Sequence, residues 1–136
     1  MAQALLRLKR RSEFLRVARS GRHAASPGLV LQTLSRPRAE GAEDTVPPMR
    51  LGITVTRKVG NAVRRNRVRR RLRAVAAEVL PSQAREGYDY VLIGRAATLT
   101  RPYPDLLVDL GRALTRLRVR NGAAEAERPA RSAGRP

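Results

Sequence analysis

A dense run of cationic side chains marks the middle of this chain of 136 residues. Residues 57–73 read RKVGNAVRRNRVRRRLR, in which nine of 17 side chains are cationic and none is acidic. The next acid along the chain is Glu78, so ion pairs four residues apart cannot neutralise the run. Guanidinium groups fork onto phosphate and stack on bases, which makes this segment a candidate site for nucleic acid.

Helical periodicity divides the run into two faces. At about 100° per residue, Val68, Leu72, Val75 and Val79 fall within about 60° of one another, which predicts a buried stripe. The polar positions lie elsewhere on the wheel: Asn66, Arg70 and Arg73 opposite the stripe, Arg67 and Arg69 flanking these, and Arg64, Arg65 and Arg71 beside the stripe. We interpret the cationic face as a partner-binding surface. A merely solvated face usually mixes signs, and the stripe lacks the bulky aromatic residues that anchor membrane-surface helices.

The turn before this helix offers further contacts. Gly60 and Asn61 are typical of a strand-to-helix turn, and Arg57 and Lys58 come directly before it. A helix N-terminus exposes amides that favour phosphate at this position. Asn66 lies inside the arginine run, where its amide can contact a sugar hydroxyl or a base edge, or fix neighbouring arginines.

Charge over the whole chain supports the same partner. The net charge is +18, from 29 cationic and 11 acidic residues, and nucleic acid is the expected polyanion because binding releases condensed counterions. Only Lys9 and Lys58 are lysines; the arginine excess fits phosphate recognition and equally fits a GC-rich genome. Cysteine is absent. No apolar run approaches the ~20 residues of a membrane span and residues 1–11 lack a signal-peptide core, so we expect a cytoplasmic protein with no membrane partner.

Groups for protein-based catalysis are sparse. The single histidine, His23, is expected at the surface near a turn, and the densest acids, Glu40, Glu43 and Asp44, fall in a proline-rich loop. A metal-dependent nuclease needs clustered carboxylates or histidines, and no nucleophile with a base and an orienting group is visible. We therefore predict no catalytic residue, no metal site and no cofactor bound by the protein alone.

The flanking sequence predicts the elements that hold the basic helix. Helices are expected at residues 13–19, capped by Ser12, at residues 61–80, closed by Pro81, and at residues 104–119. Strands are expected at residues 29–34, 50–57 and 88–95, with a weaker strand at residues 22–25 and a loop at residues 36–49. Apolar and polar side chains alternate through residues 50–57, which predicts one covered and one open sheet face.

The order α-β-β-β-α-β-α predicts an α+β two-layer sandwich, in which a mixed sheet of about four strands packs on helices. A strand–helix–strand unit from residue 50 to residue 95 requires a parallel pair. Residues 1–120 are expected to form a single RNA-binding domain. Residues 121–136 have no apolar period and are expected to form a disordered basic tail.

The run from Leu51 to Arg73 closely resembles the signature of the bacterial ribonuclease P protein family. That signature joins a strand, two basic residues, a Gly-Asn-Ala-Val turn and an Arg-Asn-Arg core, which is Arg65, Asn66 and Arg67 here. Four features at fixed spacing make the resemblance specific. The N-terminal segment Leu-Lys-Arg followed by Glu-Phe, and the segment DYVLI near the predicted last strand, are also similar, so the resemblance spans roughly residues 5–118.

The resemblance implies a subunit of an endoribonuclease whose RNA performs the hydrolysis that removes the 5′ leader of precursor tRNA. Mg²⁺ is then expected in the RNA active site of the holoenzyme, with one protein per RNA subunit, and the fold is expected to contain a left-handed βαβ crossover against the usual rule. The residues implied for binding the ribonuclease P RNA are Arg57, Lys58, Asn61, Arg64, Arg65, Asn66, Arg67, Arg69, Arg70 and Arg73. Those implied for the leader of precursor tRNA, in a cleft between the first helix and the open sheet face, are Lys9, Arg10, Arg11 and Phe14.

One feature of the family pattern is missing. Family members often line the leader cleft with several aromatic residues, whereas the positions near Ala18 and Gln32 are not aromatic here. Leader affinity is then expected to depend more on cations than on stacking. Phe14 either contacts the leader or belongs to the core. Composition alone also fits a ribosomal-type or nucleoid structural protein, and the signature run favours ribonuclease P over it.

Overall fold

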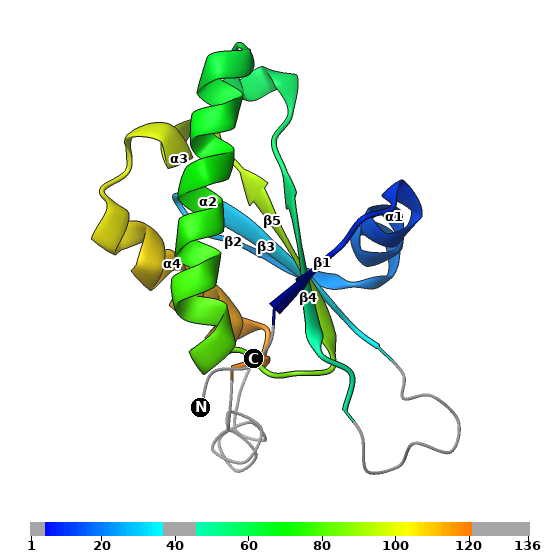
Figure 1. Ribbon diagram of the computed structural model, residues 1–136. Helices are drawn as coiled ribbons and strands as arrows, with labels where there is room; N and C mark the ends of the chain where they lie inside the picture. Colours follow the sequence, from blue (N-terminus) through cyan, green and yellow to red (C-terminus); the bar gives the residue numbers. More distant parts are fainter. Residues whose placement is uncertain (1–4, 37–45, 121–136) are drawn as a thin grey trace.

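The computed structural model describes residues 5–36 and 46–120 (Figure 1). Five strands, four α-helices and one 3-10 helix follow one another within these ranges. In chain order they are β1 (Leu5–Arg7), α1 (Arg11–Ser20), β2 (Arg22–Ala25), β3 (Leu29–Ser35), β4 (Met49–Thr54), η1 (Arg57–Val59), α2 (Ala62–Gln83), β5 (Tyr88–Gly94), α3 (Ala96–Thr100) and α4 (Tyr103–Arg116).

The strands form one mixed sheet in the order β1-β4-β5-β3-β2. β4 pairs in parallel with both β1 and β5, whereas β3 pairs antiparallel with both β5 and β2. In this register Leu92 of β5 lies opposite Ile53 of β4 on one side and Leu31 of β3 on the other. The α+β class and the parallel pair around α2 are therefore confirmed.

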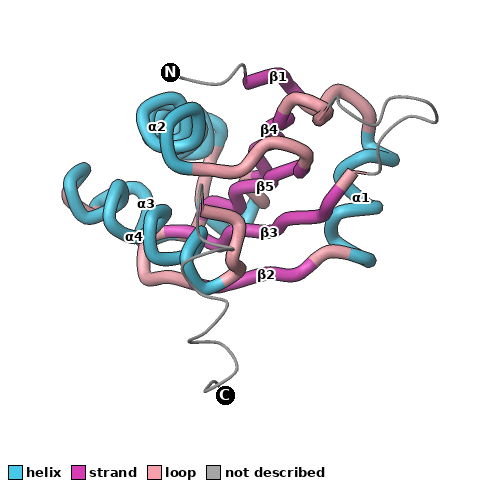
Figure 2. The backbone as a smooth tube through the Cα atoms, turned by 90° about the horizontal axis from the view of Figure 1, so that it is seen from below, coloured by secondary structure: helices cyan, strands magenta, loops and turns pink. Residues whose placement is uncertain are grey.

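Helices lie on both faces of the sheet. α2, α3 and α4 occupy one face and α1 the other (Figures 1 and 2). The main core lies between the sheet and the helices α2, α3 and α4. Leu31, Leu72, Leu92 and Leu110 have no exposed surface there. A smaller apolar cluster joins α1 to the opposite face. The single helix α1 therefore covers its face with much less buried apolar surface than the three helices on the other side.

β1 raises the number of strands to five, where the sequence predicted about four. Arg7 interrupts the apolar pattern and Leu6 is 47% exposed, so this strand has no alternation that a sequence pattern could reveal. Its backbone pairs with the start of β4, and the pairing continues where the Leu8 N–H donates to the Leu51 carbonyl at 2.9 Å. β1 thus depends on backbone hydrogen bonds supplied by a strand more than 40 residues away.

The predicted start of α1 is wrong. The helix begins at Arg11, and Ser12 lies inside it rather than capping it. Glu13 instead binds free backbone N–H groups at the helix start. Its carboxylate accepts the N–H of Lys9 at 2.9 Å and that of Arg10 at 3.0 Å. A carboxylate in the first turn also interacts favourably with the helix dipole.

Two further boundaries differ from prediction. β4 ends at Thr54 rather than at residue 57, because the chain turns there into η1. α2 does not close at Pro81 but continues to Gln83. Pro81 lacks the N–H that would bond the carbonyl of Ala77, but it lies in the last turn of the helix, where only this one backbone bond is lost.

The C-terminal helices also differ in their bounds. α3 was not predicted, since one helical turn is too short to show an apolar period. It is held by Thr98, whose hydroxyl donates to the Gly28 carbonyl at 2.5 Å and accepts the Arg95 N–H at 2.9 Å. α4 begins at Tyr103 rather than residue 104 and ends at Arg116 rather than residue 119, and its Leu106, Leu110 and Leu114 side chains are buried.

Some predictions lie outside the described residues. These are the tail at residues 121–136 and the acids Glu40, Glu43 and Asp44. The division into a domain and a tail therefore stays a prediction, as does the left hand of the crossover from β4 through α2 to β5.

Candidate RNA-binding surfaces

α2 has one buried face and one cationic face. Val68, Leu72 and Val75 have no exposed surface and Val79 is only 3% exposed, which confirms the predicted stripe. The predicted polar residues of the helix differ in exposure. Arg64, Asn66, Arg67, Arg70 and Arg73 are exposed, and Arg65, Arg69 and Arg71 are half-buried. We call the exposed set the basic face of α2.

The turn before α2 is shaped by Gly60 and Asn61. Gly60 has a φ of 147°, a conformation that favours glycine, and a Cβ there would lie 2.8 Å from Cδ of Arg64. Asn61 is the N-cap, because its side-chain oxygen accepts the Arg64 backbone N–H at 2.9 Å. Arg57 and Lys58 lie exposed in η1 directly before this turn. Asn61 therefore caps the helix, in addition to the RNA contact predicted for it. The capping preference of asparagine could have indicated this structural role.

Asn66 acts on a neighbouring arginine, one of the roles considered for it. Its side-chain oxygen accepts Nη1 of Arg69 at 2.8 Å. Arg71 donates instead to the backbone carbonyl of Arg101, which ties α2 to the end of α3. Nε of Arg65 is buried and has no hydrogen-bond partner among the described residues. The three half-buried arginines of α2 therefore have three different environments, and only Arg69 is oriented by the Arg-Asn-Arg core.

A groove of about 500 Å³ lies between α1 and the sheet, and we call it the α1 groove. Apolar side chains from α1, β4 and β5 form most of its walls. Its lining consists of Arg11, Phe14, Leu15, Ala18, Gln32, Ile53, Thr54, Val55, Arg69, Val91 and Ile93. Apolar walls suit the faces of bases, and the guanidinium groups of Arg11 and Arg69 suit phosphates.

Phe14 serves both the core and the groove. It is half-buried, packs against the smaller apolar cluster and lines the α1 groove. Its ring lies directly over Gly52 of β4, where a Cβ would be only 2.4 Å from Cε2 of the ring. The two alternatives for Phe14 are therefore compatible. Ala18 and Gln32, which stand where aromatic residues were expected, also line the groove.

The four residues predicted to bind the leader fall into two groups. Arg11 and Phe14 line the α1 groove. Lys9 and Arg10 are exposed at the start of α1 and are not part of its lining. They lie at the same helix end as Arg11, so they extend the cationic character of that end toward solvent.

An ion-pair network fixes α1 to the sheet. Asp89 of β5 is fully buried, and it accepts Nε of Arg50 at 2.8 Å and Nη2 at 2.7 Å. Nη1 of Arg50 donates to the Glu13 carboxylate of α1 at 2.8 Å. Arg16 and Arg36 lie 3.8 Å and 3.7 Å from the Asp89 oxygens. Arg50 therefore bridges a buried acid of the sheet to an acid on α1, which helps to set the position of α1 over the groove.

This network was missed in the sequence. The signal was Asp89 in the otherwise apolar strand YDYVLIG, since a charge in a buried strand needs a partner.

Hydrogen bonds from the backbone N–H groups of Arg10 and Lys9, and then the guanidinium of Arg50, lower the pKa of Glu13 to about 2. Glu13 therefore stays charged and paired far below neutral pH.

Among the described residues, no three side chains of His, Cys, Asp or Glu come together as a group that could hold a metal ion. His23 is exposed on β2, as expected. None of the helices in residues 5–36 and 46–120 combines the length and the hydropathy that a membrane crossing requires.

Comparisons with known proteins agree on one family. The family model described as Ribonuclease P matches residues 3–118. The chain is 50% identical over 129 residues to the Ribonuclease P protein component of Paramagnetospirillum magneticum, covering 95% of both chains. It is also 50% identical over 120 residues to that of Gluconacetobacter diazotrophicus, covering 88% of this chain and 97% of the relative.

Solved structures give the same result. The RNase P protein of Staphylococcus aureus superimposes with a TM-score of 0.65 at 26% identity, covering 83% of this chain and 95% of that one. The RNase P protein of Thermotoga maritima superimposes with a TM-score of 0.62 at 25% identity, covering 76% and 90%.

Proposed function

We propose that this chain, which belongs to the ribonuclease P protein family, binds RNA through two separate surfaces. As a protein component of that endoribonuclease, the chain is a partner of the ribonuclease P RNA. The basic face of α2, with the turn before it, binds the ribonuclease P RNA. The α1 groove holds the single-stranded 5′ leader of precursor tRNA. Family membership replaces the alternative of a ribosomal-type or nucleoid structural protein.

The observation that carries this division is the chemical contrast between the two surfaces. The basic face presents exposed guanidinium groups with no acid between residues 57 and 77, which suits the closely spaced phosphates of a folded RNA. The α1 groove has apolar walls with two guanidinium groups, Arg11 and Arg69. Apolar walls gain most from bases whose faces are free, and these exist in single strands rather than in duplexes.

Cations are proposed to supply much of the leader affinity. Phe14 is the only phenylalanine of the chain, and Ala18 and Gln32 offer no ring for stacking. Arg11 lies at the groove, and Lys9 and Arg10 are exposed beside it at the helix start. Their charges attract the leader backbone without reading its sequence, which suits a protein that must accept many precursor tRNAs.

The chemistry is assigned to the RNA. We propose that Mg²⁺ acts in the RNA active site, that one protein joins each RNA subunit, and that the holoenzyme works in the cytoplasm. The test is cleavage of precursor tRNA by the cognate ribonuclease P RNA at low Mg²⁺, with and without the protein. The protein alone should leave the substrate intact, and its addition should increase cleavage. If RNA-free protein cleaves the substrate efficiently, and this activity survives further purification, the assignment is wrong.

The leader site is tested at Phe14. Phe14→Ala should weaken binding of leader-bearing tRNA by ~1–3 kcal/mol if a base stacks on the ring, and should barely affect mature tRNA or the RNA subunit. Phe14→Leu keeps most of the apolar volume and separates loss of the ring from loss of packing. If Phe14 serves only the core, Ala costs up to ~3–5 kcal/mol of folding stability. Both tRNAs would then be affected equally, in step with a denaturant melt.

A further inference from the structure

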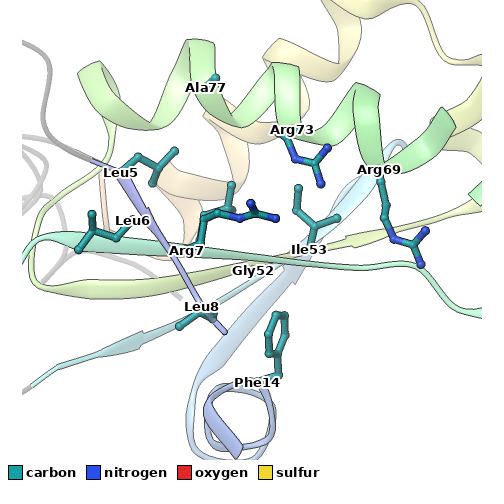
Figure 3. Close-up of a pocket in the computed structure, with 11 residues that line it drawn as sticks. Leu5, Leu6, Arg7, Leu8, Phe14, Gly52, Ile53, Arg69, Arg73 and Ala77 are labelled. Carbon is teal, nitrogen blue, oxygen red and sulfur yellow. The ribbon is translucent and has the colours of Figure 1, made fainter. Parts of the chain in front are cut away.

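A second cavity, of about 350 Å³, lies between β1, β4 and α2 (Figure 3). Apolar side chains make up much of its lining, among them Leu5, Leu8, Leu51 and Ile53. β1 forms one wall, and this strand was invisible to sequence patterning. The cavity therefore exists only because β1 pairs with the start of β4 beneath α2.

Three arginines bring positive charge to this cavity. Arg7 reaches it from β1, and Arg69 and Arg73 reach it from α2 (Figure 3). Its lining contains no acid, and among the described residues no ion pair joins any of the three arginines to a carboxylate. In Figure 3 the guanidinium groups of Arg7 and Arg73 both point into the space beside Ile53. Like charges gathered without a counterion favour an anionic ligand.

Apolar walls with a cationic rim suit one nucleotide of a single strand. A base can pack on the leucine and isoleucine side chains while its phosphate meets the guanidinium groups. We propose that this cavity is a second nucleotide subsite for the 5′ leader, with Arg7 as a phosphate-binding residue. The proposal rests on the function proposed above for the α1 groove and extends the leader path beyond it.

Continuity with the α1 groove identifies the leader as the source of this nucleotide. The two cavities share Phe14, Ile53 and Arg69, so they adjoin at these three side chains and consecutive nucleotides of one strand can occupy both. Arg69, oriented by Asn66, lies at the junction. The basic face of α2, in contrast, shares only Arg73 with the second cavity.

Ala77 allows a test in both directions. It lies on an exposed position of α2 and lines the second cavity but not the α1 groove. Ala77→Glu places a negative charge where the phosphate is proposed, and Ala77→Lys places a positive one. Both residues are good helix formers, so the helix should tolerate either. Arg7→Gln removes the proposed contact directly, and Arg19→Gln is the matched control because Arg19 is exposed on α1 and lines neither cavity.

The measurement is the dissociation constant of each holoenzyme for precursor tRNA with a leader and for the same tRNA without one. Arg7→Gln and Ala77→Glu should each weaken leader-dependent binding about tenfold, the loss typical of one charge-assisted contact. Ala77→Lys should strengthen it, and Arg19→Gln should leave it unchanged. The log–log salt slope for leader binding should fall by roughly 0.7 in Arg7→Gln.

Three other outcomes overturn the proposal in distinguishable ways. If wild-type holoenzyme does not prefer leader-bearing tRNA, the proposed function of the α1 groove fails first. If it does, but Arg7→Gln and Ala77→Glu retain the full preference, the second subsite alone is refuted. If the variants instead weaken assembly with the ribonuclease P RNA and leave the leader preference intact, the cavity binds the RNA subunit rather than the leader.

Discussion

Gly52→Ala should disturb the proposed leader site without removing any side chain from it. Gly52 lies in β4 under the ring of Phe14. A Cβ there would be 2.4 Å from Cε2 and 2.6 Å from Cζ of that ring, and 3.0 Å from Cδ1 of Leu8. Ordinary carbon–carbon contacts are ~3.5–4.0 Å, so the ring must move by more than about 1 Å.

The expected size of the effect follows from this crowding. Overpacking a close site typically costs ~1–3 kcal/mol of folding stability, and a half-buried ring can relieve part of it by swinging toward solvent. That movement carries the ring away from the floor of the groove. We therefore expect a stability loss near ~1 kcal/mol, together with a loss of leader affinity that approaches the ~1–3 kcal/mol of one stacked base.

Denaturant melts and tRNA binding, with and without the leader, measure both effects. In a Phe14→Ala background only the 3.0 Å approach to Cδ1 of Leu8 remains, so the cost of Gly52→Ala should fall sharply, and the double-mutant cycle reports the clash with the ring. Gly111→Ala is the matched control, because a Cβ there meets only the Gln83 side chain at 3.7 Å. The reasoning is refuted if Gly52→Ala and Gly111→Ala behave alike in both measurements.

Three further predictions concern the ion-pair network and the cations of α2. Arg50→Ala leaves the buried carboxylate of Asp89 without its bidentate partner and should cost ~3–5 kcal/mol in a urea melt, nearer the lower value because two other arginines remain close; an unchanged melt would contradict this. The pKa of Glu13 falls from its ordinary value of 4.5 to about 2 on folding, so its contribution is present above pH 4.5 and is lost as pH falls toward 2. Glu13→Gln should therefore flatten the acid limb of stability against pH, and a limb parallel to wild type would count against it. Replacing Arg65 and Arg67 by Ala should weaken holoenzyme assembly and lower its log–log salt slope by roughly 0.7–0.9 per lost phosphate contact; a folded double variant with unchanged affinity and slope would refute the assignment.

Periodic features of the fold could be predicted from the sequence, because the spacing of apolar residues within an element indicates which of its side chains are buried. The stripe at Val68, Leu72 and Val75 repeats at the helical period and is fully buried. Gly21 directly follows α1, where glycine is typical of a helix end, and its N–H donates to the Val17 carbonyl at 2.9 Å. These signals are local, and the chain needs no distant partner to display them.

The features that could not be predicted depend on distant partners. β1 is defined by backbone pairing with β4, and the second cavity is a consequence of that pairing. The same limit applies to the predicted sites. The helical wheel correctly placed Arg69 on a flank of α2, but it could not show that this flank lies over β4 and both cavities. Likewise, Arg50 carried no sign that it would join Glu13 to Asp89.

The arginines of this protein serve two purposes, which bears on how its net charge of +18 should be interpreted. One group stabilises the fold by donating to backbone carbonyls: Nη1 of Arg95 to Ser26 at 2.6 Å, Nη1 of Arg116 to Ala25 at 2.8 Å, and Arg22 and Arg71 to Leu117 and Arg101. These charges are partly committed within the protein. The basic face of α2 has no such carbonyl contacts among the described residues, and its cations remain available to phosphate. Lysine would be less effective for both purposes, because the planar guanidinium can bridge two acceptors at once. This difference and the genome composition explain the near absence of lysine equally well. If RNA binding is divided as proposed, the charge that binds RNA is the local charge of the two surfaces, rather than the net charge of the chain.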